Sequence, residues 1–402
     1  MNKFIQNLFL ILYPFYPFWA WACAITIKKP VDFVVNLSLF PFAIYLLNKN
    51  QKLPRYLLFF IIFTIYHTCS VFFNNLFPKD VNTLYSIFFD PHVFACTLLI
   101  IIENTNFEKW FITRMNNNVV LIILISLIVS LIQIKYPSFF LNPDIDKELI
   151  YLTENRIFSI YTWTNLNSGG ITIPILIAIL ISIYQAHKFI FPLVIISGIV
   201  LPFLTKARYV MLSAIVAFSQ LFFANKGSFI KKVSFLILLV ASIFLIGVVA
   251  EKFGVNISET INNRILEKES DMGSAKSRIT SYEVFLTKFP EHPWVGVGPE
   301  TKPDVIELLN GEATIIHIGY LSYLYFYGVV GCFFLFVSIF YLLKYAWSVG
   351  KRYDFWGSFF GLISFCLANL TFVYFNLSEM GIVIAVIYLR YYTSNHTDPI
   401  RK

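Results

Sequence analysis

Long apolar stretches, separated by short polar links, recur along this 402-residue chain and constrain its fold more than any other feature. Most are close to the roughly 20 residues that an α-helix needs to cross a bilayer, and they are apolar on every side. With 57% hydrophobic and 13% charged residues, a soluble domain of this length could not cover its apolar surface. We therefore expect an all-α integral membrane protein, a polytopic bundle of 11–12 transmembrane helices.

The apolar stretches predict helices at twelve places along one domain of residues 1–402. They lie near residues 4–26, 31–47, 56–73, 84–102, 118–134, 169–186, 189–204, 209–224, 233–250, 317–343, 355–375 and 378–392. One polar segment, residues 251–316, interrupts this series. We expect it to be a large periplasmic loop of short helices inserted between two transmembrane helices.

The distribution of lysine and arginine predicts which way the bundle faces. If the N-terminus is cytoplasmic, the short cytoplasmic links and the two ends of the chain hold 16 basic residues and the opposite short links hold 8. Basic residues concentrate on the cytoplasmic side of membrane proteins, so the count favours this orientation. The long loop holds 7 basic and 11 acidic residues, so it is net acidic and its arginines must be judged singly.

Several function classes are disfavoured by what the chain carries. The five cysteines all fall inside apolar runs, which argues against a disulfide framework. Basic residues are scattered over short links, so no nucleic-acid partner is expected. No histidine–carboxylate cluster has the spacing of a metal site, so no metal and no cofactor are expected.

Three residues at the predicted outer surface could carry chemistry. Arg208 lies in a four-residue link between two apolar helices, and Arg278 begins an amphipathic helix predicted over residues 276–289. A guanidinium can grip two phosphate oxygens, although each arginine could instead be a solvated surface charge. His317 lies where the loop meets the next helix, and it could accept a proton from a sugar hydroxyl or be a satisfied interfacial group.

Ionisable residues also occur inside the predicted spans. Asp90 and His92 lie in the fourth apolar run and His67 in the third. Such residues are costly in a bilayer and usually face the bundle interior or a cavity. They could line a substrate cavity or pair with neighbouring side chains; pairing is slightly favoured for Asp90 and His92.

Two stretches resemble motifs of one known family. Arg156-Ile157-Phe158, followed by Thr164 to Gly170, is similar to an arginine, an aromatic residue and then Asn-Pro-Asn-x-x-Gly, with Leu166 in place of the proline. Thr205-Lys206-Ala207-Arg208 resembles Thr-x-Ser-Arg, with alanine in place of serine. The family is the O-antigen ligase and O-antigen polymerase superfamily of bacterial membrane glycosyltransferases.

Further matches follow in the same order as in that superfamily. Arg278, Tyr282 and the stretch His292 to Gly298 resemble its arginine helix and His-Pro-Leu-x-Gly-x-Gly turn. The stretch His317 to Gly331 resembles its His-Asn-x-Tyr-Leu and Gly-x-x-Gly ending, with Ile318 in place of the asparagine. The resemblance covers roughly residues 155–345.

The resemblance implies an enzyme of the bacterial inner membrane that uses an oligosaccharide carried on undecaprenyl diphosphate, at the periplasmic face and without a metal. Arg208 and Arg278 would hold the diphosphate, and His317 would orient or deprotonate the acceptor hydroxyl. Arg156, Asn165 and Asn167 would bind the substrate. Asp90 is a further candidate for substrate binding, because of its position inside a predicted span.

Two acceptors remain open. A polymerase adds another lipid-linked repeat, whereas a ligase transfers the glycan to the lipid A core; drift in the motifs slightly favours a polymerase. A chain-length regulator and a flippase are possible partners. A glycolipid flippase or other transporter is the alternative from a different class, and it predicts charged groups deep in several spans.

Overall fold

The chain is almost entirely helical where the structure describes it. The computed structural model describes residues 2–26, 31–49, 53–74, 90–136, 139–140, 157, 159–163, 166–205, 208–224, 272–298, 307–309, 316, 318–370 and 375–395. Within them the helices are α1 (Asn2–Leu12), α2 (Tyr16–Thr26), α3 (Val31–Lys49), α4 (Arg55–Asn74), α6 (Pro91–Glu103), α7 (Lys109–Lys135), η1 (Ser159–Trp163), α9 (Leu166–Tyr184), α10 (Ile190–Thr205), α11 (Arg208–Ala224), α14 (Met272–Lys288), η3 (Phe289–Glu291), α16 (Gly319–Tyr353), α17 (Gly357–Ala368) and α18 (Met380–Asn395). None of these residues forms a β-strand, which confirms the all-α class.

Eleven of the twelve predicted helices coincide with described ones, and the twelfth, residues 233–250, lies outside the described residues. The first prediction was wrong in one respect, because residues 4–26 form two helices rather than one. The chain turns at Tyr13–Phe15 between α1 and α2, where Pro14 and Pro17 lack the N–H groups that a continuous helix needs.

Helix α7 begins nine residues before the predicted start, because its polar residues have partners in other helices. The Asn118 side chain donates to the Leu10 carbonyl in α1 at 3.1 Å. Asn116 accepts a hydrogen bond from the Tyr388 hydroxyl of α18. These contacts satisfy the side chains of two of the three consecutive asparagines, Asn116 to Asn118, inside the bundle.

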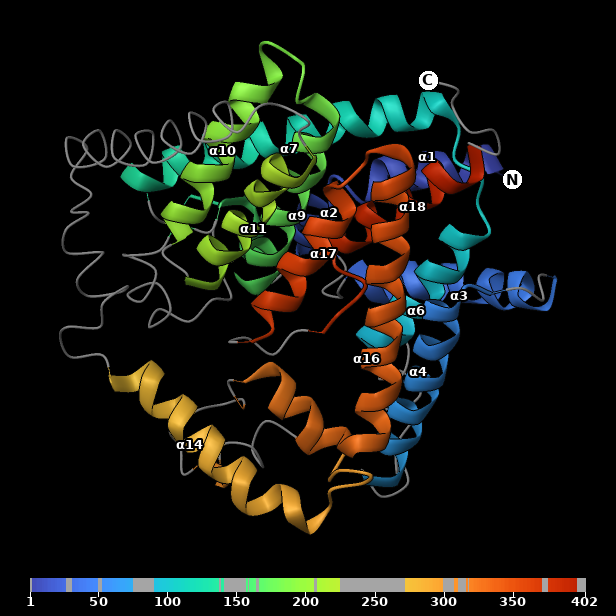
Figure 1. Ribbon diagram of the computed structural model, residues 1–402, viewed down its shortest axis with the longest axis vertical. Helices are drawn as coiled ribbons and strands as arrows, with labels where there is room; N and C mark the ends of the chain where they lie inside the picture. The colour runs from blue at the N-terminus through green and yellow to red at the C-terminus, as the bar shows by residue number, and fades with distance from the viewer. Residues whose placement is uncertain are drawn as a thin grey trace.

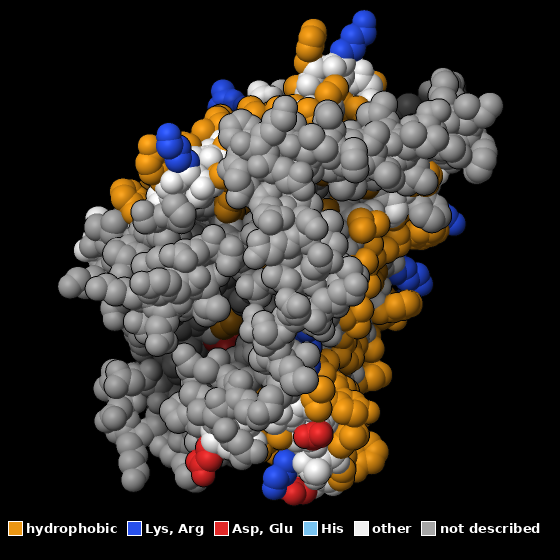
Figure 2. Space-filling model, turned by 90° about the vertical axis from the view of Figure 1, so that its left-hand side faces the viewer, with side chains coloured by type: hydrophobic (Ala, Val, Ile, Leu, Met, Phe, Trp, Pro, Cys, Tyr) orange, Lys and Arg blue, Asp and Glu red, His pale blue; other side chains and the backbone are white. Residues whose placement is uncertain are grey.

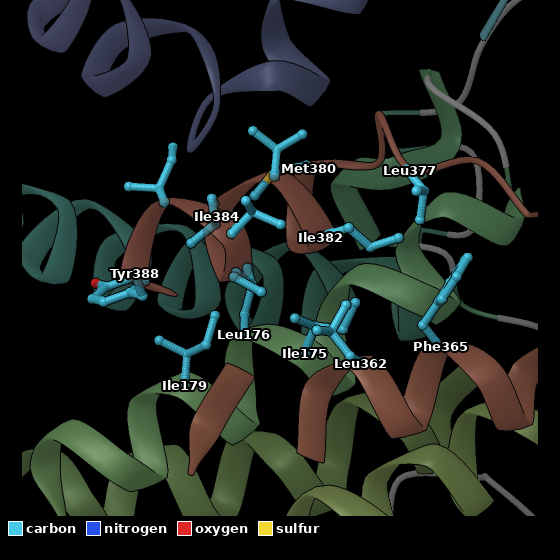
Figure 3. Packing of buried hydrophobic residues seen from close by; sticks show 14 of the residues in the cluster. Ile175, Leu176, Ile179, Leu362, Phe365, Leu377, Met380, Ile382, Ile384 and Tyr388 are labelled. Carbon is cyan, nitrogen blue, oxygen red and sulfur yellow. The ribbon is translucent and has the colours of Figure 1, made fainter. Parts of the chain in front are cut away.

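Helices α9, α17 and α18 form the most deeply buried part of the molecule. Figure 3 shows Ile175 of α9 beside Leu362 of α17, with the labelled side chains of α18 higher in the view. The helices approach closely where glycines replace side chains: a Cβ on Gly357 would lie 2.6 Å from the Ile179 Cα. Small residues at contacts of this kind are typical of helix packing in membranes.

Different helices form the two ends of the molecule. Figure 1 shows α4 and α16 running side by side toward α14, while α1 and α18 lie at the opposite end. At that opposite end, Gln6 of α1 donates to the Asn106 carbonyl at 3.1 Å and Arg390 of α18 reaches the Asn106 side chain at 3.4 Å. Helix α7 crosses this end at a steep angle to α16 (Figure 1).

Two described helices are long and apolar enough to cross a membrane, namely α7 and α16. Eight further apolar helices are shorter, with 10–17 described residues each. Figure 2 shows hydrophobic side chains along one edge of the face turned to the viewer, with acidic side chains toward its lower end. On α16, the exposed hydrophobic residues Phe333, Phe340 and Trp347 repeat every seven residues and so share one face.

Candidate functional site

The structure describes the predicted site residues to different extents. Side chains are described for Arg278 and Asp90. Arg208 is the first residue of α11 and Asn167 the second of α9, but their side chains lie outside the described residues. Arg156, Asn165 and His317 also lie outside them.

Segments next to three of these residues meet around the start of α11. The Ile157 N–H donates to the Leu204 carbonyl near the end of α10 at 3.2 Å, so the chain beside Arg156 lies against the link that carries Arg208. A Cβ on Gly170 would lie 2.8 Å from Val210 Cγ2, so the first turn of α9 packs on the first turn of α11. The structure therefore brings together the segments next to Arg156, Asn167 and Arg208.

Helix α17 joins this region to the start of α16. The Ser213 hydroxyl donates to the Ser364 carbonyl at 3.1 Å, and the Ser364 hydroxyl donates back to the Ser213 carbonyl at 2.8 Å. Two residues further on, the Cys366 carbonyl accepts from the Tyr320 hydroxyl at 2.9 Å. Ser213 is five residues from Arg208 and Tyr320 three from His317, so the C-terminal end of α17 lies between the segments that carry these two residues.

Helix α16 is interrupted at Gly328, where φ is 60° and ψ is −171°. In an unbroken helix, the N–H groups of Val329 and Val330 would donate to the carbonyls four residues back, at Tyr325 and Phe326. The interruption, here called the break, frees these four backbone groups. Buried backbone groups need partners, so something else must satisfy them.

A turn at residues 292–298, here called the glycine turn, supplies all four partners. The N–H groups of Val297 and Gly298 donate to the Tyr325 and Phe326 carbonyls at 3.1 and 2.7 Å. In return, the Val329 N–H donates to the Pro293 carbonyl at 2.9 Å and the Val330 N–H to the Trp294 carbonyl at 3.0 Å. The turn is therefore inserted into the hydrogen-bond ladder of α16.

Arg278 lies in α14, which leads through η3 into the glycine turn. It is partly exposed, but its Nε is buried and has no hydrogen-bond partner among the described residues. A buried guanidinium nitrogen without a partner is costly, and an anion would satisfy it.

Three apolar side chains of α14 differ in their surroundings. Ile279 and Tyr282 are exposed. Phe285 packs on a small second core of Leu309, Ile316 and Tyr325. Tyr325 belongs to the start of α16, which contacts α14 and lies above it in the view of Figure 1.

Asp90 is engaged with protein groups on both carboxylate oxygens. Oδ1 accepts from the N–H groups of His92 and Val93 at 2.8 and 3.1 Å, which caps the start of α6. Oδ2 contacts the His67 Nε2. Pairing with neighbours was the favoured interpretation of Asp90 and His92, and in the structure Asp90 pairs with His67.

A buried polar cluster surrounds this pair. The other ring nitrogen of His67 lies 2.7 Å from the Tyr327 hydroxyl, directly before the break. His92 Nε2 lies 3.4 Å from the Tyr323 hydroxyl, and the centroids of the His67 and His92 rings are 4.8 Å apart. The sequence analysis singled out the two histidines but not the tyrosines, which lie one helical turn apart in α16 and meet His67 of α4 and His92 of α6.

No three His, Cys, Asp or Glu side chains come together as metal ligands in the part of the chain that the structure describes. The expectation of a metal-independent site stays a prediction.

Comparison with known families supplies the decisive observation. Residues 191–337 match the family model described as O-antigen ligase. The predicted resemblance to the O-antigen ligase and polymerase superfamily is confirmed. The matched segment is less than half of the chain, and no curated protein matches the chain.

The O-antigen ligase segment includes Arg208, Arg278 and His317, together with the glycine turn and the break. Arg156, Asn165, Asn167 and Asp90 fall outside it. The family comprises bacterial inner-membrane glycosyltransferases of the ligase and polymerase type, and the apolar helices are compatible with that location.

Proposed function

We propose that this protein is a polytopic inner-membrane glycosyltransferase that uses an undecaprenyl-diphosphate-linked oligosaccharide at the periplasmic face, and that it polymerises surface polysaccharide. The observation that carries the proposal is that one O-antigen ligase segment contains Arg208, Arg278 and His317, while described contacts tie their helices together. A ligase that transfers the glycan to lipid A core is the second candidate, because the family description does not separate the two acceptors.

Several features support the membrane topology of this proposal. Helices α1 and α18 lie at one end of the molecule and α14 at the other (Figure 1). If the first end is cytoplasmic, as the excess of basic residues predicts, α14 is periplasmic. Ile279, Tyr282 and Leu286 of α14 are exposed, and an exposed apolar stripe of this kind suits contact with lipid headgroups.

Diphosphate binding is assigned to Arg208 and Arg278. Cleavage of the glycosyl bond leaves negative charge on the lipid diphosphate, and fixed cations stabilise charge that develops in the transition state. The Arg278 Nε has no partner among the described residues, and this supports the role. Arg208 contributes from the start of α11, where the helix dipole also favours an anion.

His317 is assigned to the acceptor. A neutral imidazole can take the proton of a sugar hydroxyl as that oxygen attacks the anomeric carbon, and the diphosphate leaves. The contact between Tyr320 and the Cys366 carbonyl holds the helix that starts just after His317. Arg156, Asn165 and Asn167 are proposed to contact the donor, since the described residues near them, Ile157 and Gly170, lie against residues close to Arg208.

The assignment is tested first with Arg278→Ala in membrane vesicles supplied with lipid-linked oligosaccharide. Loss of a charge-assisted diphosphate contact should cost about 3 kcal/mol or more, so transfer should fall by over about a hundredfold. Lys288→Ala is the matched control, because Lys288 is a cation of the same helix already paired with Glu291 at 3.2 Å. Full activity of the Arg278 variant would remove this residue from the site.

His317→Ala separates binding from chemistry. The variant should retain donor binding, measured by retention of radiolabelled lipid-linked oligosaccharide, and should transfer it slowly. Weakened donor binding with normal transfer once the donor is saturating would contradict the role assigned to His317.

Surface glycans of a deletion strain decide between the two acceptors. A single repeat unit on the lipid core would identify a polymerase. Long chains that accumulate on undecaprenyl carrier and never reach the core would identify a ligase.

A further inference from the structure

Tyr66, a residue of helix α4 far from the O-antigen ligase segment in sequence, contacts both the glycine turn and the break. The Tyr66 hydroxyl lies 2.7 Å from the Val295 carbonyl in the glycine turn and 3.1 Å from the Tyr327 carbonyl. The Tyr327 carbonyl would be bonded by the Gly331 N–H in a regular helix. One side chain therefore bridges the turn and the helix at the place where they interlock.

His67 extends this contact into α6. Its ring is bonded on one side to the Tyr327 hydroxyl and on the other to Asp90, which caps α6. His67 and Tyr327 are each only 5% exposed. Tyr66, His67, Asp90 and Tyr327, here called the clamp, therefore join α4, α6, α16 and the glycine turn.

Every polar atom of the His67–Asp90 pair has a protein partner. Asp90 uses one oxygen for two backbone N–H groups and the other for His67, and both His67 ring nitrogens are engaged. Such a pair has no free group to offer a substrate, and its connections run toward the break. This geometry instead allows the His67–Asp90 pair to hold neighbouring groups in place.

We propose that Tyr66, His67 and Asp90 are positioning residues, which hold the glycine turn in the break of α16 and thereby fix Arg278 relative to the start of α16, the helix that follows His317. The proposal rests on the proposed function, in which Arg278 and His317 act on one substrate. It also assigns Asp90 a role in place of the substrate contact expected from the sequence.

The geometry makes the position of Arg278 sensitive to the clamp. Arg278 is ten residues before the end of α14, so it is about 15 Å along the helix axis from the end that enters the glycine turn. A tilt of about 10° at that end would move Arg278 by about 3 Å. Misplacement by about 1 Å can lower a rate by about a hundredfold, so small movements matter.

A distance measurement tests the clamp without reference to activity. Nitroxide labels are placed at Tyr282→Cys on α14 and Phe340→Cys on α16, both exposed, in a chain whose five native cysteines are replaced by serine. Tyr66→Phe removes only the bridging hydroxyl. We expect it to broaden the distance distribution between the labels, and His67→Gln to do the same.

Tyr345→Phe is the matched control. It removes a hydroxyl from another part of α16, where Tyr345 contacts Thr393 of α18 at 2.7 Å. This variant should leave the distances unchanged. A narrow, native distribution in both Tyr66→Phe and His67→Gln would overturn the proposal.

Transfer rates then show whether the position matters for chemistry. At saturating donor, Tyr66→Phe should transfer glycan at least about tenfold more slowly per folded molecule, and Tyr345→Phe at the native rate. A merely structural role would lower the amount of folded protein but not the rate per folded molecule. An unchanged rate despite broadened distances would overturn the role in catalysis.

The two proposals fail in distinguishable ways. A native chain that transfers no glycan, while its distances still respond to Tyr66→Phe, would refute the proposed function and leave the clamp supported as the device that positions α14.

Discussion

Gly296 and Gly328 occupy each other's side-chain space. A Cβ on Gly296 would lie 2.6 Å from the Gly328 amide nitrogen, and a Cβ on Gly328 would lie 2.5 Å from the Gly296 amide nitrogen. Both residues have positive φ, at 71° and 60°. Only glycine satisfies the backbone conformation and the close approach at once.

Gly328→Ala is therefore expected to destabilise the protein. Positive φ in a residue with a side chain costs about 1–3 kcal/mol, and the clash with the turn adds to that cost. The melting temperature of detergent-solubilised protein should fall. Val329→Ala, at the exposed neighbouring residue, should change it little. Equal melting temperatures for the two variants would show that the turn does not occupy the break.

The reciprocal contact between Ser213 and Ser364 should appear in the stability of both Ser→Ala variants. Each change removes one hydrogen bond that the serine hydroxyl donates to the partner's backbone carbonyl, so the free energy of unfolding should fall by about 0.5–1.5 kcal/mol in denaturant unfolding. Ser348→Ala is the control, because the exposed Ser348 hydroxyl donates within its own helix, to the Tyr345 carbonyl. Native stability of both Ser213→Ala and Ser364→Ala would argue against the packing of α11 on α17.

Glu103 provides a contrast at the end of the molecule away from α14. Its side chain accepts from the Tyr56 hydroxyl at 2.5 Å and lies 4.0 Å from the Arg390 guanidinium. Glu103→Ala should destabilise the protein by about 1–3 kcal/mol, because it leaves these groups without their acceptor. The transfer rate per folded molecule should stay native, since the proposed site is remote. A large loss of the transfer rate would show that residues at both ends of the molecule contribute to activity.

The apolar runs predicted helix positions well, because a run of about twenty apolar residues has few alternatives in a membrane protein. The apolar runs failed to predict helix ends where contacts with other helices determine them. The helix predicted over residues 118–134 left out Asn116, which α7 includes and whose side chain accepts from Tyr388 of α18. No local sequence pattern predicts such partners.

For the candidate site, too, sequence patterns predicted some features and missed others. Arg208, Arg278 and His317 were predicted from motif order, and their roles stay predictions, although the O-antigen ligase segment includes all three. The break was not predicted, because residues 317–343 are apolar throughout and Gly328 alone does not interrupt a helix. The interruption depends on hydrogen bonds from residues some thirty positions earlier, which the sequence of α16 does not contain.

The four backbone hydrogen bonds between the glycine turn and α16 have a practical consequence for exchanging parts between related enzymes. If only the loop is moved into a related enzyme, the receiving helix stays continuous. Its backbone carbonyl and N–H groups are then already bonded to one another, and none is left to bind the loop. The transferable unit is the loop together with both halves of the interrupted helix and the tyrosine–histidine pair of α4. Chimeras cut at those boundaries should insert and fold, and chimeras cut at the loop ends should not.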